Sequence, residues 1–302
     1  MYLINIQFAY ILGVKKYNLT RRNSAFYMGI NMLTIAFIER CSFKMRHSRM
    51  GGRLDFLWSF LRPLYVLFLR IIYYKGLPRN INGTDFIRLD VRLHGHVETY
   101  EPAVWAMVME SLRSGDTFLD VGANLGLYSI AAAKRIGTKG LVVALEPIPK
   151  TARILESNLL INHIEDRTEV IQAAAGAACG VVKMIDAGVE SAISTTGRRV
   201  PLITVDSIFP NQPVNVLKID TEGYEEFVLH GSRQLLLDIT RRPRVIFIEV
   251  HPFAWVQTGT SSHSILSFLN EHGYLVKNID GEIIDIIDRY GEIVAYPVPV
   301  IQ

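Results

Sequence analysis

The chain has 302 residues, of which 49% are hydrophobic and 20% charged, so it can build a packed core and is not globally disordered. Its 22 glycines and 12 prolines exclude a collagen-like or low-complexity protein, and two cysteines exclude a disulfide framework. Residues 1–79 hold 13 basic and 2 acidic residues, a net +11, whereas residues 80–302 hold 19 and 27, a net −8. We therefore predict a basic leader over residues 1–79 and an acidic domain over residues 80–302.

The strongest apolar stretch of the leader is Leu54–Tyr74, where 16 of 21 residues are apolar. Its polar residues fall on one narrow stripe of a helix, because successive helical residues are rotated by about 100°. A charged residue at the centre of a bilayer costs about 2.5 to 3.5 kcal/mol, against about 0.3 to 0.6 kcal/mol gained by each Leu, Ile, Phe or Val. Asp55, Arg62 and Arg70 therefore cancel the apolar gain, and no transmembrane helix is predicted.

Three interpretations of the leader stay open. In the first, residues 54–74 form a helix that lies on a membrane surface, which predicts a cytoplasmic protein held at the inner face of the membrane. In the second, the same helix packs against the acidic domain or against a partner. In the third, translation begins downstream, at Met28, Met45 or Met50.

From Asp85 onward the chain alternates between strand and helix patterns, which is typical of a doubly wound α/β fold with a mostly parallel sheet. The apolar runs predict five parallel strands: Asp116–Val121, Gly140–Leu145, Thr168–Ala173, Val214–Ile219 and Arg244–Val250. Periodic segments predict four helices: Leu127–Ile136, Ile148–Asn162, Glu225–Ile239 and Ser262–His272. Two antiparallel strands at Tyr274–Asn278 and Glu292–Tyr296 complete a seven-stranded sheet, and Gly180–Val205 is predicted as an insertion of short strands.

A glycine-containing turn, Asp120-Val-Gly-Ala-Asn-Leu-Gly126, follows the first predicted strand. Glycines at such a turn let the backbone approach a ligand closely. Glu146 ends the second strand, so its carboxylate emerges at the same edge of the sheet as that of Asp120. A carboxylate in this place accepts hydrogen bonds from the hydroxyls of a ribose. The sequence therefore predicts a site for a nucleoside-containing cofactor.

Two cofactors carry a ribose in such a position. A nicotinamide dinucleotide favours the pattern G-x-G-x-x-G, because its pyrophosphate needs free backbone N–H groups, and here Asn124 stands where the second glycine would be. Asp120 would also bring a negative charge toward that pyrophosphate. S-adenosylmethionine has no phosphate, and its ammonium and sulfonium favour a nearby carboxylate. The residues therefore favour S-adenosylmethionine.

A second motif, Leu217-Lys-Ile-Asp-Thr-Glu-Gly-Tyr-Glu-Glu226, ends the fourth predicted strand. The first and fourth strands are neighbours at the topological switch point of a doubly wound sheet. Asp220 and Glu222 are therefore predicted to lie beside Gly122, where a transferable methyl group would be held.

These motifs together resemble the FkbM family of S-adenosylmethionine-dependent methyltransferases over roughly residues 99–279. The residues that carry the resemblance occur in the order of the family: Phe118–Gly126, Ala144–Pro147, Thr204–Ile208, Lys218–Glu225 and Ile248–Glu249. The resemblance implies a class I, Rossmann-like methyltransferase that acts on hydroxyls of sugars, glycolipids or natural products. It also implies the cofactor-binding positions, which are Asp120, Gly122, Asn124, Gly126 and Glu146, with Tyr100 and Glu101 from a less specific upstream segment.

The resemblance further implies that Asp220, Glu222 and Glu249 are acidic residues near the site of methyl transfer. An alcohol must lose a proton when it is methylated, and we take Asp220 as the acceptor-side residue, with Glu222 and Glu249 holding or sharing the proton. Alternatively, one of these carboxylates pairs with Lys218 and only shapes the site. His251, which follows Glu249 closely, is a further candidate base.

The expected partner is a small-molecule or glycan hydroxyl, and the acidic domain argues against nucleic acid. His94 and His96 share one face of a strand pattern without a third ligand, so no metal site is predicted. Three alternatives stay open: methylation of nitrogen or of a protein or lipid on the same fold, a nicotinamide-dependent oxidoreductase, and a membrane-attached binding protein without activity. The sequence gives no prediction of the oligomeric state.

Overall fold

The computed structural model describes residues 63–93, 98–185, 192–193 and 197–299. The chain divides into two compact units, Met1–Phe68 and Leu69–Gln302. Most of the predicted leader, together with His94 and His96, lies outside the described residues. The predicted boundary at residue 79 falls inside strand β1 (Leu77–Ile81), which pairs antiparallel with β2 (Asp85–Leu89) and has buried apolar side chains.

Residues 63–72 are helical, so only the second half of the stretch at residues 54–74 is described. In the described ranges, no helix has the length and apolarity needed to cross a membrane. The side chains of Leu64, Leu67 and Ile71 on this helix are more than half exposed, at 64%, 54% and 70%.

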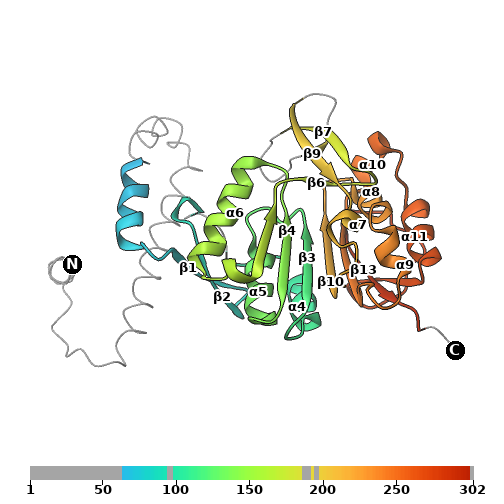
Figure 1. The fold of residues 1–302 in the computed structure, drawn as a ribbon, viewed down its shortest axis with the longest axis horizontal. Coiled ribbons are helices and arrows are strands. Elements are labelled where there is room, and N and C mark those ends of the chain that lie inside the picture. The colour runs from blue at the N-terminus through green and yellow to red at the C-terminus, as the bar shows by residue number, and fades with distance from the viewer. Residues whose placement is uncertain (1–62, 94–97, 186–191, 194–196, 300–302) are drawn as a thin grey trace, which may run out of the picture. The chain divides into compact units, whose positions relative to one another are not determined.

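The second unit is built on a seven-stranded sheet in the order β12-β13-β11-β10-β3-β4-β5 (Figure 1). Its strands are β3 (Thr117–Val121), β4 (Leu141–Leu145), β5 (Thr168–Ile171), β10 (Val216–Asp220), β11 (Val245–Val250), β12 (Tyr274–Asn278) and β13 (Gly291–Pro297). The strands β5, β4, β3, β10 and β11 are parallel, and β13 is antiparallel to both β11 and β12. This confirms the predicted doubly wound, mostly parallel sheet.

Both faces of the sheet are covered, because alternate strand residues are apolar on each face. One core joins Phe118 and Phe247 of the sheet to the β1–β2 hairpin and to three helices: α4 (Pro102–Ser111), α5 (Leu127–Ile136) and α6 (Pro149–Ile161). The other core joins Leu119 and Ile248 to the helices α7 (Val205–Ile208), α8 (Glu225–His230), α9 (Arg233–Leu237), α10 (Pro252–Thr258) and α11 (Ser262–Glu271). Two short 3₁₀ turns, Val91–Leu93 and Glu165–Arg167, lie in the connections.

The helix expected at Glu225–Ile239 is in fact two helices, α8 and α9, separated at Gly231. A side chain at Gly231 would place its Cβ 2.0 Å from the carbonyl oxygen of Gly176. The chain therefore turns where it touches the backbone of the segment after β5, and the helical pattern cannot continue straight through this contact.

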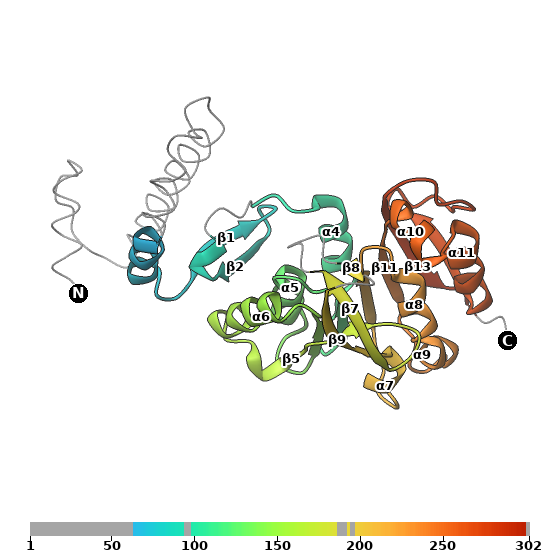
Figure 2. The ribbon, with the colours of Figure 1, turned by 90° about the horizontal axis from the view of Figure 1, so that it is seen from above.

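The predicted insertion forms a separate four-stranded sheet, β6-β9-β7-β8, which Figures 1 and 2 show beside the ends of the main strands. Its strands are β6 (Ala174–Ala175), β7 (Gly180–Ile185), β8 (Ala192–Ile193) and β9 (Arg198–Ile203). Met184 and Val200 of this sheet pack against Ile148, which precedes α6. The insertion is thereby fixed next to the end of β4.

Candidate active site

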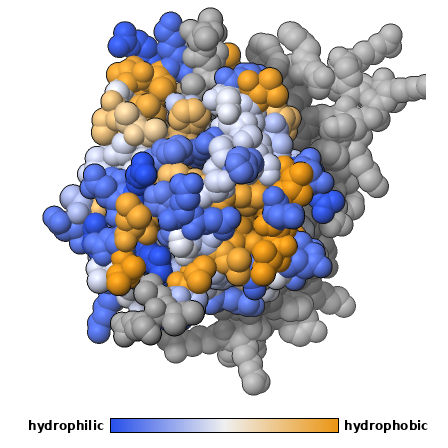
Figure 3. All heavy atoms as spheres, turned by 90° about the vertical axis from the view of Figure 1, so that its right-hand side faces the viewer, coloured by the Kyte–Doolittle hydropathy of each residue, from blue (hydrophilic) through white to orange (hydrophobic). Residues whose placement is uncertain are grey.

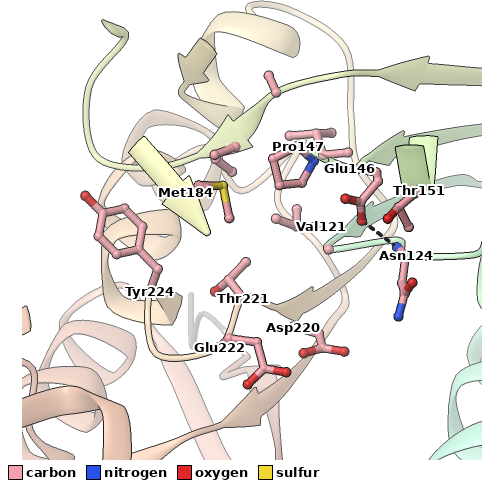
Figure 4. A pocket seen from close by; sticks show the side chains of 15 residues that line it. Val121, Asn124, Glu146, Pro147, Thr151, Met184, Asp220, Thr221, Glu222 and Tyr224 are labelled. Atoms are coloured by element: carbon pink, nitrogen blue, oxygen red, sulfur yellow. Dashed lines mark hydrogen bonds between the residues drawn. The ribbon is translucent and has the colours of Figure 1, made fainter. Parts of the chain in front are cut away.

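A pocket lies at the carboxyl ends of β3, β4 and β10, where ligands bind in open α/β sheets (Figure 4). Asp220 and Glu222 stand at one end of it, and Pro147 and Met184 at the other. Met184 comes from β7, so the inserted sheet supplies part of the wall. The pocket is lined by Val121, Gly122, Asn124, Leu145, Glu146, Pro147, Thr151, Ala173, Ala174, Ala175, Met184, Asp220, Thr221, Glu222 and Tyr224.

The turn after β3 brings three strand ends together. Gly122 has a φ of 83°, and a Cβ at this position would lie 1.7 Å from the carbonyl oxygen of Asp220. Only glycine permits this conformation and this close approach. The N–H groups of Gly122 and Ala123 both donate to the carbonyl of Leu145, at 3.0 and 2.9 Å. The backbone at the ends of β3, β4 and β10 is therefore fixed around the pocket.

Glu146 is held in one orientation by backbone donors. The N–H of Asn124, whose φ is 49°, donates to Oε2 at 3.0 Å, and the N–H of Ile148 donates to Oε1 at 2.8 Å. Each carboxylate oxygen can accept more than one hydrogen bond, so Glu146 can still bind two ribose hydroxyls. The N–H groups of Gly122, Ala123, Asn124 and Gly126 all donate within the protein, which disfavours a pyrophosphate at this turn.

Two predicted cofactor residues of the turn, Asp120 and Gly126, lie outside the lining of the pocket, as do Tyr100 and Glu101. Asp120 is 1% exposed and accepts a hydrogen bond from the Ser129 hydroxyl at 2.6 Å. Burial raises the pKa of Asp120, although Lys218 and Ser129 act in the opposite direction. Gly126 has a φ of 82° before α5, and a Cβ there would lie 2.2 Å from Leu155 of α6. Contacts within the protein thus account for Asp120 and Gly126 at these positions without a contact to the pocket.

Three carboxylates form a row across neighbouring strands at the same edge of the sheet. Asp220 of β10 is in register with Glu249 of β11, which is in register with Glu292 of β13. Glu101, which precedes α4, reaches the same place, because carboxylate oxygens of Glu101, Glu249 and Glu292 lie within 4.8 Å of one another. We refer to Asp220, Glu249, Glu292 and Glu101 as the acidic cluster.

Lys218 provides the buried positive charge beside the acidic cluster. Its Nζ lies 3.2 Å from Oδ2 of Asp220 and 4.9 Å from the centre of the Tyr128 ring. Burial alone would lower the pKa of Lys218, but the charges of Asp220 and Asp120 outweigh burial and raise it. Lys218 therefore stays an ammonium, and its pairing with Asp220 is the arrangement that the sequence left open as an alternative.

Glu249 is a carboxyl group of the cluster whose pKa is raised toward neutrality. Burial and the neighbouring charge of Asp220 raise the pKa of Glu249 to about 7, against a hydrogen bond from the Tyr290 hydroxyl and the charge of Lys218. Burial and Glu101 also raise the pKa of Glu292. A group with a pKa near neutrality can take up a proton during a reaction.

Tyr100 and Glu101 approach the cluster from the covering layer rather than from the pocket wall. The Tyr128 hydroxyl donates to Oε2 of Glu101 at 2.8 Å, and the Tyr100 ring packs edge-on against Trp105 and Tyr128. The main chain of Tyr100 is tied to Asn82, in the turn between β1 and β2. The hairpin thus holds this segment over the acidic cluster.

A second group of polar residues, Glu222, Glu225 and His251, lies beside the cluster. Nε2 of His251 is 3.3 Å from Oε2 of Glu222, whose backbone has an unusual φ of 52°, and Nδ1 is 2.9 Å from Oε1 of Glu225. Burial lowers the pKa of His251, but the hydrogen bond and charge of Glu225, with Glu222 and Asp220, outweigh burial and raise it.

Sequence reasoning did not assign Glu225, Glu292 or Tyr290 to the site. Glu225 ends the recognised motif, so its presence there was a usable signal. Glu292 and Tyr290 became site residues only through the register of β13 with β11.

Asp220, Glu249 and His251 each offer a possible ligand atom, and these atoms lie within 4.8 Å of one another. Asp220, however, is already paired with the Lys218 ammonium, and Nε2 of His251 is directed to Glu222. We therefore assign no metal to the cluster.

The rim of the site next to His251 is apolar and open. Phe253 of α10 is 70% exposed, with its ring centre 5.7 Å from that of His251, and Val256 is 89% exposed. Figure 3 shows the side of the molecule that carries α10 and α11, where separate apolar areas are divided by polar ones.

The family model described as "Methyltransferase FkbM domain" matches residues 120–276, just over half of the chain. The chain belongs to this family. It therefore carries the methyltransferase domain of this family, and the site fits S-adenosylmethionine as the cofactor, since it offers a fixed carboxylate for ribose hydroxyls, an apolar wall and further carboxylates for the cationic end.

Comparison with curated proteins gives one partial relative. Protein-L-isoaspartate O-methyltransferase 1 of Archaeoglobus fulgidus is 28% identical over 97 residues, which are 28% of this chain and 43% of that protein. The chain thus spans less than half the length of this relative.

Solved structures similar to this chain share low sequence identity with it. An S-adenosylmethionine-dependent O-methyltransferase from Thermotoga maritima is 15% identical, with a TM-score of 0.40 over 67% of this chain and 68% of that chain. The precorrin-6y C5,15-methyltransferase of Geobacter metallireducens is 15% identical, with a TM-score of 0.39 over 65% and 88%. An O-methyltransferase from Bacillus cereus, solved with S-adenosylhomocysteine, is 16% identical, with a TM-score of 0.37 over 65% and 79%.

Proposed function

We propose that the protein transfers the methyl group of S-adenosylmethionine to a hydroxyl oxygen of a sugar, glycolipid or natural product. The observation that carries this proposal is the acidic cluster, which reaches the pocket through Asp220 and includes Glu249, whose pKa is raised to about 7. S-adenosylmethionine supplies a methyl group on a sulfonium, whose sulfur leaves as a neutral thioether. The remaining task of the protein is to orient the acceptor and remove its proton.

The pocket residues suggest how the cofactor is held. Glu146 binds the ribose hydroxyls, and the wall of Pro147 and Met184 covers the adenine. Asp220 and Glu222 lie at the other end of the pocket (Figure 4), where they would attract the ammonium and sulfonium of the cofactor. Gly122 and Asn124 shape the turn beneath the cofactor. Asp120, Gly126, Tyr100 and Glu101 support this arrangement from outside the pocket lining.

On the acceptor side, Asp220, Glu222 and Glu249 remain the acidic residues nearest to the transfer point. Asp220 is paired with Lys218, so it holds charge next to the methyl group, while Glu249, with its raised pKa of about 7, can hold or share the proton released in the reaction. The exposed side chains of Phe253 and Val256 favour an acceptor with an apolar part beside its hydroxyl, as in a glycolipid or natural product.

The negative charge of the cluster also favours a second candidate acceptor, an amine, because an ammonium would be attracted to it. The two can be separated by incubating the full chain with methyl-labelled S-adenosylmethionine and paired acceptors. We suggest octyl glucoside and methyl glucoside as alcohols, and their 2-amino analogues as amines.

The proposal expects label in an ether that resists mild base, with octyl glucoside labelled faster than methyl glucoside. Label only in the amino compounds would support nitrogen methylation. Cofactor binding without label in any alcohol, across a wider set of lipid and polyketide hydroxyls, would contradict oxygen methylation.

We further propose that the helix around residues 63–72 lies on an anionic membrane surface at the cytoplasmic side. The exposed apolar side chains of Leu64, Leu67 and Ile71 recur along one face of it, and residues 1–79 carry a net +11. Apolar burial and basic charge together are what a peripheral membrane helix uses.

A further inference from the structure

We propose that His251 is the residue that takes the proton from the acceptor hydroxyl, and that Glu225 is its positioning residue. The inference rests on the proposed oxygen methylation and names the base that this reaction needs. It starts from the surroundings of Glu225, a carboxylate that lies outside the pocket lining.

Glu225 is completely buried, with 0% of its surface exposed, and its charge is met by three donors. The N–H of Gly223 donates to Oε1 at 2.7 Å, and Nδ1 of His251 lies 2.9 Å from the same oxygen. The indole N–H of Trp255 donates to Oε2 at 3.0 Å. Both oxygens are thus occupied, so Glu225 is fixed in place and its contact to His251 is not exchanged with water.

This contact determines the tautomer of His251. A carboxylate oxygen only accepts hydrogen bonds, so Nδ1 of His251 must carry a hydrogen and donate it to Glu225. In the neutral ring, Nε2 is then the free acceptor. The same logic operates in the Ser-His-Asp triad, where a buried carboxylate selects the tautomer of the histidine and stabilises the imidazolium that forms.

Nε2 of His251 faces the transfer end of the site, where in the imidazolium it pairs with Glu222. Nε2 lies 3.3 Å from Oε2 of Glu222 and 3.9 Å from Oε1 of Glu249, both on the acidic side. The rings of Tyr290 and Phe253 flank the imidazole, with centres 5.3 and 5.7 Å away. His251 itself is only 2% exposed, so Nε2 is shielded from bulk water, and an acceptor hydroxyl reaches it from the side of Glu222, which lines the pocket.

The carboxylates that could compete for the proton are already engaged. Asp220 holds the Lys218 ammonium at 3.2 Å, and Glu249 accepts the Tyr290 hydroxyl. His251 differs from both because Nε2 faces two carboxylates, which stabilise the imidazolium and raise the pKa of His251. His251 therefore acts as the base at pH values above this raised pKa, where Nε2 has lost its proton. The negative groups around it come from every packed element: Glu225 of α8, Glu222 and Asp220 at the end of β10, and Glu249 of β11, with the Tyr290 phenol beside them.

The proposed step is balanced within the site. The acceptor oxygen forms a bond to the methyl carbon, and the carbon–sulfur bond breaks with its electron pair going to sulfur. The hydroxyl proton moves to Nε2 of His251 and leaves later, through Glu222, whose side chain is 26% exposed, to solvent. No oxidant, reductant or metal is required.

The first experiment needs no acceptor. The full chain, labelled with ¹⁵N-histidine and bound to S-adenosylhomocysteine, is titrated by NMR from pH 6 to pH 10. We expect His251 to lose its proton from Nε2 and keep the one on Nδ1, with a pKa above the usual 6.5. His272, whose Nδ1 donates to the carbonyl of Phe268 at 2.7 Å, is an internal control that should be the same in all variants.

The second experiment uses an alcohol that becomes labelled in the methylation experiment, together with three variants of the protein. His251→Asn keeps a donor toward Glu225 but lacks Nε2, so turnover should fall about 10²-fold or more, with affinity for S-adenosylhomocysteine changed less than about threefold. Glu225→Gln removes the charge while its carbonyl can still accept from Nδ1, so the acid limb of the pH–rate profile should move to lower pH. Trp255→Phe, which removes a donor to Glu225 but keeps its charge, should leave that limb in place.

Results of three kinds would overturn the inference. One is a His251 with its hydrogen on Nε2, or one that stays doubly protonated up to pH 10. Another is a His251→Asn variant that turns over like the wild type, or a Glu225→Gln variant with an unmoved acid limb. The third is a shift of the His251 signals on addition of Mg²⁺ or Zn²⁺ that also restores activity to the EDTA-treated protein, since His251 would then be a metal ligand. If the NMR result holds and no alcohol is methylated, the proposed function fails while the Glu225–His251 arrangement stands.

Discussion

Replacing Glu249 with glutamine should make the protein more stable at alkaline pH than the wild type. In the folded protein, burial and Asp220 raise the pKa of Glu249 to about 7, whereas its ordinary value is 4.5. The contribution of protonated Glu249 to the free energy of unfolding is fully present below pH 4.5. It is lost as the pH rises to about 7, because the folded state must then ionise a buried carboxyl group. The glutamine side chain would resemble the protonated acid at every pH and would still accept the Tyr290 hydroxyl.

The size of the effect follows from the displacement of the pKa. A difference of about 2.5 units at about 1.36 kcal/mol each corresponds to about 3 kcal/mol between pH 4.5 and pH 8. The side chain of Glu249 is only 9% exposed, so solvent screening reduces this value little. The free energy of unfolding of Glu249→Gln minus that of the wild type should therefore rise by about 3 kcal/mol over this range.

Urea denaturation at pH 4.5, 6, 7 and 8, followed by circular dichroism, measures this difference directly. Glu156→Gln, which removes an exposed carboxylate on α6, is the matched control for loss of a surface charge. A difference that stays constant with pH, or that falls as the pH rises, would refute the assignment of a neutral-range pKa to Glu249.

Three further predictions concern ligand and membrane binding. Glu146→Ala should weaken S-adenosylhomocysteine about ten- to a hundredfold in isothermal titration calorimetry, because a charged hydrogen-bond acceptor is lost; unchanged affinity would remove Glu146 from the cofactor site. Met184→Ala should weaken both adenosine and S-adenosylhomocysteine by a similar factor, about three- to tenfold, because apolar cover is lost; an effect on S-adenosylhomocysteine alone would place the adenine elsewhere. The full chain should float with anionic liposomes at low salt and be released as the salt concentration rises; protein that stays in the dense fraction at low salt would show that residues 63–72 pack within the protein instead.

The sheet and the cofactor turn were predictable because their signals are local. Apolar runs ending in Gly122 and Glu146, followed by helical periodicity, fix both the strands and the edge at which the side chains emerge. The insertion was predictable for the same reason, because its short strand patterns stand between longer strand and helix patterns. The break at Gly231 was not, because it depends on a contact with Gly176, which is distant in sequence.

The candidate site was only partly predictable, because its members are joined by register and burial. Asp220 and Glu222 could be placed from their strand, but the addition of Glu292 depends on how β13 pairs with β11. Likewise, Glu225 could be seen in the motif, whereas its contact with His251 depends on how α8 packs against the end of β11. Sequence spacing alone could not show that Asp120 accepts a hydrogen bond from Ser129 and lies outside the pocket lining.

The origin of Met184 has a consequence for local unfolding. This side chain belongs to a sheet that is separate from the main one, yet it forms part of the pocket wall. A ligand that contacts Met184 binds only when β7 is packed in its place at the pocket. Ligand binding therefore increases the free energy needed to open the insertion. Amide hydrogens of β7 and β9 should therefore exchange more slowly with S-adenosylhomocysteine present, by a factor that grows in proportion to ligand concentration, while those of β12 keep their rates.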